Sequence, residues 1–446
     1  MNILVLVDGE HYPPVTRWGI AAARTMGHEI AAALLVGGVE KLSAGQTPEL
    51  GVPLRIAGSD PKAALASAID ELRPDGVLDL SDEPILGYRE RMELAAVSLA
   101  RGVPYLGADF RLDPPIAGPP LPRPTVAVIG TGKRTGKTAI AGELARVAAR
   151  SARNPIVVAM GRGGPAAPQV AEAGSVTVQS LLELVRRGEH AASDYLEDAV
   201  TTGVTTIGAR RAGGGLAGAP YVSSVRPAAE MAVGLGAGLV VLEGSGSSVP
   251  PVPWDAGVLV VPASAPPEYV GGYLGPFRLL LSDVVVVTMA SSPAGLENLP
   301  ALRSHVQRLR DDARLVVTEF EPHPLADVQG KDVFFTTTAP EAVAARQASQ
   351  LEAAHGCRVV GWSARLADRV GLAQDMDGAE AYDVLLTELK AAAVDVACDR
   401  ALDRGAEVVF VDNRAVVVEG DVDLATVLEE TIGLAERRYE HRHGNR

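Results

Sequence analysis

The first part of the chain alternates short apolar runs with stretches in which apolar residues recur at helical spacing. Alternating strands and helices are typical of a parallel sheet with right-handed crossovers and helices on both faces. We therefore predict a doubly wound, Rossmann-like α/β domain over residues 1–112. Strands are expected at residues 2–7, 29–38, 77–80 and 103–107, and helices at residues 15–27, 61–76 and 88–102.

Residues 113–124 ("DPPIAGPPLPRP") interrupt this pattern with six prolines. Because proline lacks a backbone N–H and breaks helices and central strands, the segment predicts a stiff linker. A long surface loop inside a single domain is the alternative interpretation.

A second α/β unit begins at Thr125, and we assign residues 125–375 to a P-loop NTPase-type domain. Its apolar runs are continuous, as in strands that helices cover on both faces of a sheet. Strands are expected at residues 125–130, 155–161, 238–244, 256–264, 282–290 and 313–320, and a helix at residues 139–150.

The last segment, residues 376–446, changes character and predicts a small α+β addition. Apolar positions at helical spacing predict one long helix over residues 378–405, which a glycine ends. Residues 406–420 predict a β-hairpin that turns near Asp412 and Asn413.

Composition narrows the class of protein. The 446 residues carry a net charge of −14, which argues against a nucleic-acid partner because phosphates require a basic face. No apolar stretch approaches the ~20 residues of a membrane span, and the N-terminus does not resemble a secretory signal. The two cysteines, Cys357 and Cys398, match no metal-site spacing and are expected to be buried packing residues. We therefore expect a cytoplasmic protein without a membrane partner.

A glycine-rich loop, "GTGKRTGKT" at residues 130–138, lies between a predicted strand and a predicted helix. The common phosphate-binding loop is G-x-x-x-x-G-K-[ST], but five positions before Gly136 stands Thr131, with a glycine on either side. The physical requirements are still met, because glycines let backbone N–H groups turn toward an anion at a helix N-terminus. We expect ATP to be bound by Gly130, Thr131, Gly132, Lys133, Arg134, Thr135, Gly136, Lys137 and Thr138.

A nucleotide site of this kind requires Mg²⁺ as well as the loop. The hydroxyl of Thr138 could bind the ion directly. Glu243, at the end of the apolar run "GLVVLE", is the expected acid of the metal shell. A strand-end acid that only faces solvent is the alternative.

Cations gather around this loop in an acidic protein. Of only six lysines in the chain, Lys133 and Lys137 lie inside the loop. Arginine forks match phosphate oxygens, so arginines beside glycine-rich segments suggest a polyanionic ligand, although any one could be a solvated surface residue. The candidates are Arg134, Arg162, Arg210, Arg211 and Arg226.

Polar residues also follow the strands of the N-terminal domain. Ligands of open α/β sheets bind at the carboxyl ends of strands, so Asp8, Glu10 and His11 are candidates for substrate binding. A histidine that only hydrogen-bonds the turn is the alternative. The acids of "LDLSDEP" (Asp79, Asp82 and Glu83) could hold a metal or simply line a polar loop.

The loop and the segment "LEGSG" resemble dethiobiotin synthetase over about a third of the chain. A resemblance over nearly the whole chain is to cyclic 2,3-diphosphoglycerate synthetase. It is carried by "DGEHYPPVTRW", "VIGTGKRTGKTA", "VVLEGSGSSVPP", "ELKAAAVDVACDRAL" and "VVFVDN", in this order.

This resemblance implies an ATP-dependent ligase that joins the two phosphates of 2,3-diphosphoglycerate into a cyclic anhydride and releases ADP and Pi. It implies catalytic roles for Lys137, Arg134 and Glu243, with Mg²⁺ held by Thr138 and Glu243. Substrate phosphates would be bound by Arg162, Arg210 and Arg211. It also implies a homodimer.

Two other functions stay open. A dethiobiotin-synthetase-like ligase would activate a carboxylate and would need a less positive site. A partition-type ATPase switch carries a signature lysine five residues before the loop lysine, where this chain has Gly132.

Overall fold

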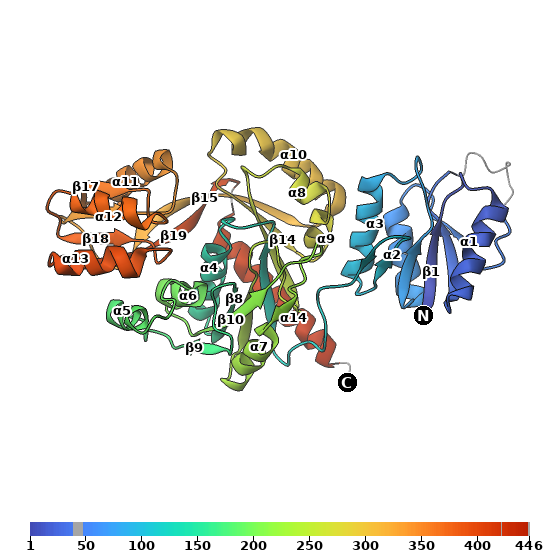
Figure 1. Ribbon diagram of the computed structural model, residues 1–446, viewed down its shortest axis with the longest axis horizontal. Coiled ribbons are helices and arrows are strands. Elements are labelled where there is room, and N and C mark those ends of the chain that lie inside the picture. Colours follow the sequence, from blue (N-terminus) through green and yellow to red (C-terminus); the bar gives the residue numbers. More distant parts are fainter. Residues whose placement is uncertain (39–47, 421, 445–446) are drawn as a thin grey trace.

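The structure is a computed structural model that describes residues 1–38, 48–420 and 422–444 (Figure 1). An N-terminal domain stands to one side of a large central sheet, and the C-terminal strands extend this sheet on the other side. None of the described helices is long and apolar enough to cross a membrane.

The N-terminal sheet has the strand order β3-β2-β1-β4-β5-β6, and only the last pair is antiparallel. Helix α1 covers one face, where Ile20 packs with alternate residues of β1, and α2 and α3 cover the other. The predicted doubly wound sheet is therefore confirmed. The elements are β1 (Asn2–Val7), α1 (Pro13–Thr25), β2 (Glu29–Leu35), β3 (Leu54–Ile56), α2 (Pro61–Leu72), β4 (Gly76–Asp79), α3 (Tyr88–Ala100), β5 (Tyr105–Leu106) and β6 (Arg111–Leu112).

The central sheet runs in the order β11-β10-β8-β12-β7-β13-β14-β15-β19-β18-β16-β17. Helices α4 and α14 pack on one face of its P-loop part, and α7 and α10 pack on the other. The first half of the sheet is formed by β7 (Thr125–Gly130), β8 (Pro155–Gly161), β9 (Gln169–Ala171), β10 (Thr206–Ala212), β11 (Val222–Ser223), β12 (Leu239–Glu243), β13 (Ala256–Pro262), β14 (Val284–Thr288) and β15 (Arg314–Pro324). Its helices are α4 (Lys137–Arg150), α5 (Val178–Arg186), α6 (Asp194–Thr202), α7 (Val225–Gly234), α8 (Glu268–Gly271), α9 (Gly275–Leu280) and α10 (Pro293–Leu309).

The C-terminal segment continues the same sheet. Its elements are β16 (Asp332–Thr336), α11 (Glu341–His355), β17 (Arg358–Ser363), α12 (Arg369–Asp377), β18 (Val384–Thr387), the π-helix η2 (Ala393–Cys398), α13 (Asp399–Asp403), β19 (Glu407–Glu419) and α14 (Leu424–Gly444). Its core is continuous with α5 and α6, because Leu181 and Leu196 pack in one cluster with Leu385 and Cys398. Both cysteines are buried and free, as predicted.

The long helix predicted over residues 378–405 is wrong. Residues Val384–Thr387 form β18 instead, and helical structure begins only at Ala393. All four residues of β18 are buried, because the strand lies between β16 and β19 and is hydrogen-bonded to both. Apolar residues at Tyr382, Leu385, Leu389, Ala392 and Val396 have a helical spacing, but the continuous burial of Val384–Thr387 is that of a central strand.

The hairpin predicted near Asp412 and Asn413 is also wrong. A single strand, β19, runs through both residues, parallel to β18 in its first half and antiparallel to β15 in its second. The Asp412 carboxylate lies 2.9 Å from a guanidinium nitrogen of Arg146, and the Asn413 amide donates to Glu388 at 2.6 Å. These polar residues contact partners distant in sequence, so they do not need a solvated turn.

The N-terminal domain sits on α9. Phe277 and Leu274 pack with Leu94 and Val97 of α3 in one buried cluster. A cavity of about 350 Å³ lies beside this contact, between α2 and α3 on one side and α9 and α10 on the other. The position of α9 therefore determines where the N-terminal domain lies.

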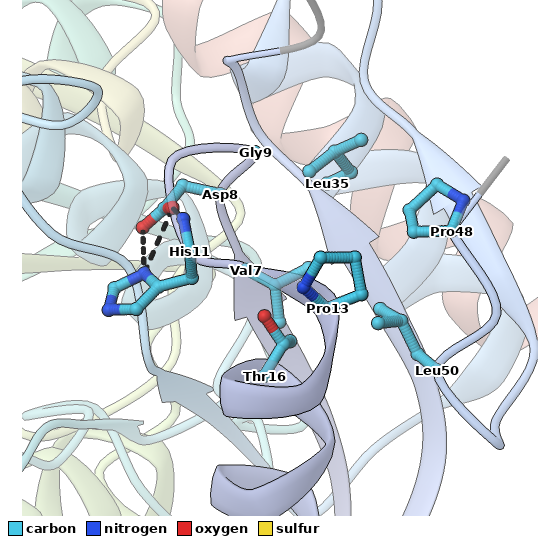
Figure 2. A pocket seen from close by; sticks show the side chains of 9 residues that line it. All are labelled: Val7, Asp8, Gly9, His11, Pro13, Thr16, Leu35, Pro48 and Leu50. Atoms are coloured by element: carbon cyan, nitrogen blue, oxygen red, sulfur yellow. Dashed lines mark hydrogen bonds and ion pairs between the residues drawn. The ribbon is translucent and has the colours of Figure 1, made fainter. Parts of the chain in front are cut away.

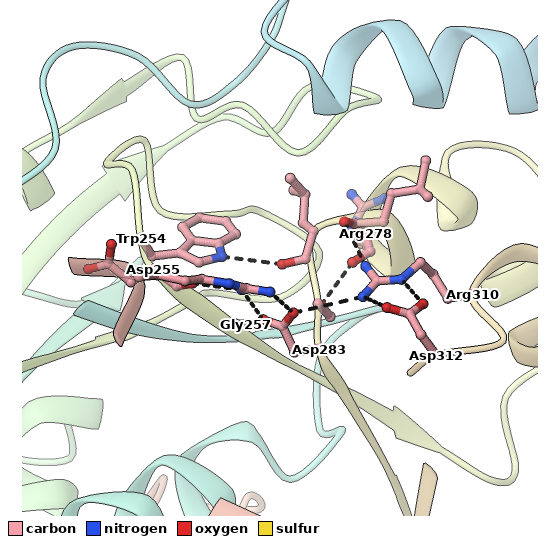
Figure 3. A network of polar contacts seen from close by, with 11 residues as sticks. Trp254, Asp255, Gly257, Arg278, Asp283, Arg310 and Asp312 are labelled. Carbon is pink, nitrogen blue, oxygen red and sulfur yellow. Dashed lines mark hydrogen bonds and ion pairs between the residues drawn. The ribbon is translucent and has the colours of Figure 1, made fainter. Parts of the chain in front are cut away.

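Polar contacts at the amino ends of β13 and β14 tie the C-terminal helix to the sheet (Figure 3). The Asp283 carboxylate accepts from the Gly257 amide at 3.0 Å and from both terminal guanidinium nitrogens of Arg438 at 2.9 and 2.8 Å. Asp312, in contrast, is largely exposed and forms its ion pair with Arg310.

We expect Asp283→Ala to lower the free energy of unfolding by about 2–3 kcal/mol, because a buried amide and a forked guanidinium lose their acceptor. Asp312→Ala removes an exposed ion pair and should cost below about 1 kcal/mol. Urea-induced unfolding of both variants measures the difference. Equal losses would contradict a structural role for the Asp283 network.

Candidate active site

The glycine-rich loop joins β7 to α4, as the sequence predicts. The Lys137 ammonium lies over the loop and donates to the Gly132 carbonyl at 2.7 Å and to the Thr135 hydroxyl at 3.2 Å. The Thr288 hydroxyl, at the end of β14, donates to the Thr135 carbonyl at 2.8 Å. A neighbouring strand thus fixes the loop from behind.

Two glycines of the loop are favoured because a side chain would be crowded there, and Gly136 is also favoured by its conformation. A Cβ on Gly136 would lie 2.4 Å from the Phe320 ring, and its φ of +91° disfavours other residues. A Cβ on Gly130 would lie 2.8 Å from the Thr135 hydroxyl and 3.0 Å from the Lys137 side chain. The glycine before Thr131 therefore leaves room for the lysine to cross the loop.

Glu243 ends β12, the strand next to β7, and is 3% exposed. Its Oε1 accepts from the Thr138 hydroxyl at 2.7 Å. No donor group of the described residues binds its buried Oε2 or the carboxylate oxygens of Asp198 on α6, and these two acids lie next to each other. The structure thus brings together the two residues predicted as the metal shell.

Arg210 and Arg211 lie in β10, where the sequence analysis expected only a glycine-rich turn, and they point to opposite faces of the sheet. Arg211 is 9% exposed and donates to the carbonyls of Ser245 at 2.9 Å and Gly213 at 2.7 Å. Arg210 is exposed and donates to the Gly164 carbonyl at 2.5 Å.

Some of the other predicted cations lie near the loop after Glu243, and one lies elsewhere. A Cβ on Gly246 would lie 3.2 Å from an Arg211 nitrogen and 3.8 Å from Lys133, so both side chains flank the loop after Glu243. Arg162 is exposed and is an electrostatic neighbour of Arg211. Arg226 is remote in role, because its guanidinium binds the linker carbonyls at positions 117 and 119, each at 2.9 Å.

Three family models match consecutive parts of the chain. They are described as the N-terminal domain (residues 2–113), the P-loop domain (residues 125–319) and the C-terminal domain (residues 324–414) of cyclic 2,3-diphosphoglycerate synthetase. The chain belongs to the cyclic 2,3-diphosphoglycerate synthetase family.

Curated members of this synthetase family match nearly from end to end. The cyclic 2,3-diphosphoglycerate synthetase of Rubrobacter xylanophilus is 46% identical over 417 residues, which cover 93% of this chain and 94% of the relative. The synthetase of Methanothermobacter thermautotrophicus is 41% identical over 435 residues, or 95% and 94% of the two chains. Among solved structures, LpxK from Aquifex aeolicus with ATP is similar at 12% identity and a TM-score of 0.40, covering 72% of this chain and 90% of LpxK.

The N-terminal candidates of this synthetase-family chain lie apart from the P-loop. Figure 1 shows β1, which precedes them, and α4 in separate parts of the molecule. The Asp8 carboxylate lies 2.9 Å from the ring Nδ1 of His11 (Figure 2). It also accepts from the His11 amide at 2.9 Å and from the Asp82 amide at 2.7 Å. Asp8 therefore shapes the loops after β1 and β4, and the His11 ring lies against it. Glu10 belongs to the same turn.

The acids at the end of β4 and in the loop after it differ in their contacts. Asp79 accepts from the Tyr105 hydroxyl at 2.8 Å and pairs with Arg91 at 2.8 Å, while Glu83 is exposed. The described part of the chain contains no cluster of three or more histidine, cysteine, aspartate or glutamate side chains that could hold a metal.

One acid of the site escaped the sequence analysis. Asp194 begins α6 and is an electrostatic neighbour of Lys137, Glu243 and Arg162. Asp194 is exposed at the surface, but surrounding protein atoms displace much of the water around its carboxylate, and this partial desolvation raises its pKa. The only local signal was a serine and an acid at the start of a helix, which usually indicates a cap.

Burial perturbs the charged groups at the centre of the site. It lowers the pKa of Lys137 to about 8, against the opposing attraction of Glu243 and Asp194. Burial, and then repulsion from Asp194, raise the pKa of Glu243 to about 7. Burial and the Glu243 charge raise the pKa of Asp198 well above its usual range. Desolvation thus disfavours the charged forms of Lys137, Glu243 and Asp198.

We expect Glu243→Gln to stabilise the nucleotide-free protein above pH 7 and to change little near pH 4.5. The folded-state pKa of about 7 exceeds the ordinary 4.5, so the stability that the proton provides is lost as the pH rises through 7. The difference corresponds to at most ~3 kcal/mol. Glutamine still accepts from Thr138 but carries no charge.

Urea-induced unfolding at pH 5 and pH 8, with a chelator present, measures this effect. Glu183→Gln, on the exposed surface of α5, is the control for loss of a surface charge. Destabilisation by Glu243→Gln at pH 8 would contradict the electrostatic analysis.

Proposed function

We propose that this chain forms the intramolecular phosphoanhydride of cyclic 2,3-diphosphoglycerate from 2,3-diphosphoglycerate, with ATP converted to ADP and Pi. Membership of the synthetase family is the single observation that carries the proposal. The geometry supports it, because two neighbouring loops carry the required groups. The glycine-rich loop holds Lys137 and Thr138, and Arg211 binds the loop that follows Glu243. Such a site suits a substrate whose phosphates must be held near those of ATP.

The residues present fit a Mg²⁺ ion. The Thr138 hydroxyl and the Glu243 carboxylate are hard oxygen ligands 2.7 Å apart, and no donor group of the described residues binds Glu243 Oε2. Asp194 stands close enough to Lys137 and Glu243 to influence both, so it is a further candidate for this shell. When bound, the ion would offset the negative charge of the nucleotide phosphates.

The reaction needs two transfers at phosphorus. One substrate phosphate attacks the γ-phosphorus of ATP, the bond to ADP breaks, and a substrate pyrophosphate results. An oxygen of the second substrate phosphate then attacks the phosphorus that was activated. Pi leaves with the bridging oxygen, and the cyclic anhydride closes.

Little proton transfer is required, since both nucleophiles are already anions. The main obstacle is repulsion among phosphoryl oxygens, which is severe in a site with little water. We assign Lys137 and Arg134 to the ATP phosphates and Arg162 and Arg211 to the substrate phosphates. Lys133 was predicted to bind ATP, but it flanks the loop after Glu243 together with Arg211, so we assign it to the substrate phosphates instead.

Arg210 has a supporting role in this proposal, because it holds the Gly164 carbonyl of the loop that carries Arg162. The N-terminal candidates Asp8, Glu10 and His11 stay predictions for substrate binding, as do the homodimer, the cytoplasmic location and the domain boundaries.

Phosphorus NMR of the purified protein with ATP, Mg²⁺ and 2,3-diphosphoglycerate tests the reaction. We expect a new anhydride resonance in step with one equivalent of Pi. Lys137→Ala should lower kcat by ~100-fold or more, because the nearest cation to the transferred group is lost. ATP consumption without the anhydride resonance, or only with a carboxylate substrate, would contradict the proposal.

Arg211 and Arg210 offer a matched pair of substitutions, adjacent in sequence and on opposite faces of β10. We expect Arg211→Met to raise the KM for 2,3-diphosphoglycerate by about tenfold or more, since a forked contact to phosphate is lost. Arg210→Met should have the smaller effect. Steady-state kinetics compare the two, and a larger effect at Arg210 would argue against the assignment.

A further inference from the structure

Arg278 on α9 is a buried arginine without an acidic partner. It is 6% exposed, and no ion pair joins it to a carboxylate within the described residues. Burial alone lowers its pKa, to about 10, so the side chain stays charged at neutral pH. A buried guanidinium in this state is costly, and an apolar residue of similar size would serve stability at least as well.

Among the residues that the structure describes, the hydrogen-bond partners of the guanidinium are backbone carbonyls. Its Nε and one terminal nitrogen donate to the Ser247 carbonyl at 3.1 and 2.7 Å, and the other terminal nitrogen donates to Leu274 at 3.0 Å. The double contact to Ser247 requires the planar fork of arginine, which a lysine cannot reproduce.

Ser247 lies in the loop that follows Glu243. Arg211 holds the same loop from its other end, at the Ser245 carbonyl, and its Nε is buried without a partner. The loop closes on itself through two backbone contacts between Ser245 and Ser248, at 3.3 and 3.0 Å. Two buried guanidinium groups therefore clamp the segment that connects to the proposed metal ligand.

Helix α9, which carries Arg278, also packs against the N-terminal domain. Phe277, next to Arg278, is fully buried in the cluster that α9 shares with α3. Arg278 thus connects α9, on which the N-terminal domain packs, to the loop beside Glu243.

We propose that Arg278 is a positioning residue for the phosphate substrate: through the Ser247 carbonyl it holds the 244–248 loop, and with it Arg211, in register with α9 and the N-terminal domain. The proposal rests on the function proposed above. Arg278 does not touch the reacting groups. Its charge, together with that of Arg211, makes the loop a favourable place for a phosphate monoester.

Arg278→Met and Arg278→Lys test this role in the full-length protein. Arg226→Met is the matched control, because its guanidinium also binds only two backbone carbonyls but holds the linker instead. Hydrogen exchange of the amides of residues 244–249, measured by mass spectrometry without ligands, reports on the loop. We expect exchange about tenfold faster in both Arg278 variants and unchanged in Arg226→Met.

Steady-state kinetics provide the second readout. We expect the KM for 2,3-diphosphoglycerate to rise about tenfold or more in both Arg278 variants, with the Kd of ATP unchanged, because the phosphate site loosens while the P-loop does not. Unchanged loop exchange, or equal losses of ATP and substrate affinity, would overturn the role of Arg278. If Arg278→Met does not fold, the Arg278→Lys variant decides. The exchange measurement needs no substrate, so a wild-type protein that makes no cyclic product would contradict the proposed function alone.

Discussion

Two opposite charges, the Lys137 ammonium and the Glu243 carboxylate, are buried at the carboxyl edge of the central sheet without a direct ion pair between them among the described contacts. Lys137 is held by the loop, and Glu243 is held by Thr138. Because they do not neutralise each other in a direct ion pair, the ammonium can bind phosphate oxygens and the carboxylate can bind a cation. The surrounding structure holds the two charges near the same loop, shields them from water and prevents them from pairing. These are the conditions for strong electrostatic stabilisation of a phosphoryl group.

The C-terminal segment supports the site through helix α6. Lys390, just after β18, lies 3.1 Å from the Glu197 carboxylate on α6. The same helix carries Asp194 and Asp198, and it shares a hydrophobic core with the C-terminal strands. A remote part of the sequence therefore supports the helix that faces Lys137. Arg278 supports the opposite side, where the loop after Glu243 meets α9, on which the N-terminal domain packs.

The elements that sequence analysis located correctly are those in which neighbours along the chain determine the structure. The loop from Gly130 to Thr138 is contiguous, and its glycines, lysine and threonine carry their own requirements. Glu243 was found because a buried strand that ends in an acid is a strong local pattern. Arg210 and Arg211 were judged alike, since the weakly apolar run "TIGARRA" did not reveal the strand β10 that turns one inward and the other outward.

The sequence by itself determined the doubly wound N-terminal domain, the phosphate-binding loop and the acid next to it, because periodicity and spacing are local properties. Only the tertiary structure decided that residues Val384–Thr387 are a strand and that β19 does not turn, because ladder partners and the ion pair of Asp412 with Arg146 come from distant segments. It also decided the surroundings of Asp194 and Arg278. The free energy of a buried charge depends on which groups surround it in space, and that neighbourhood exists only once the chain is folded.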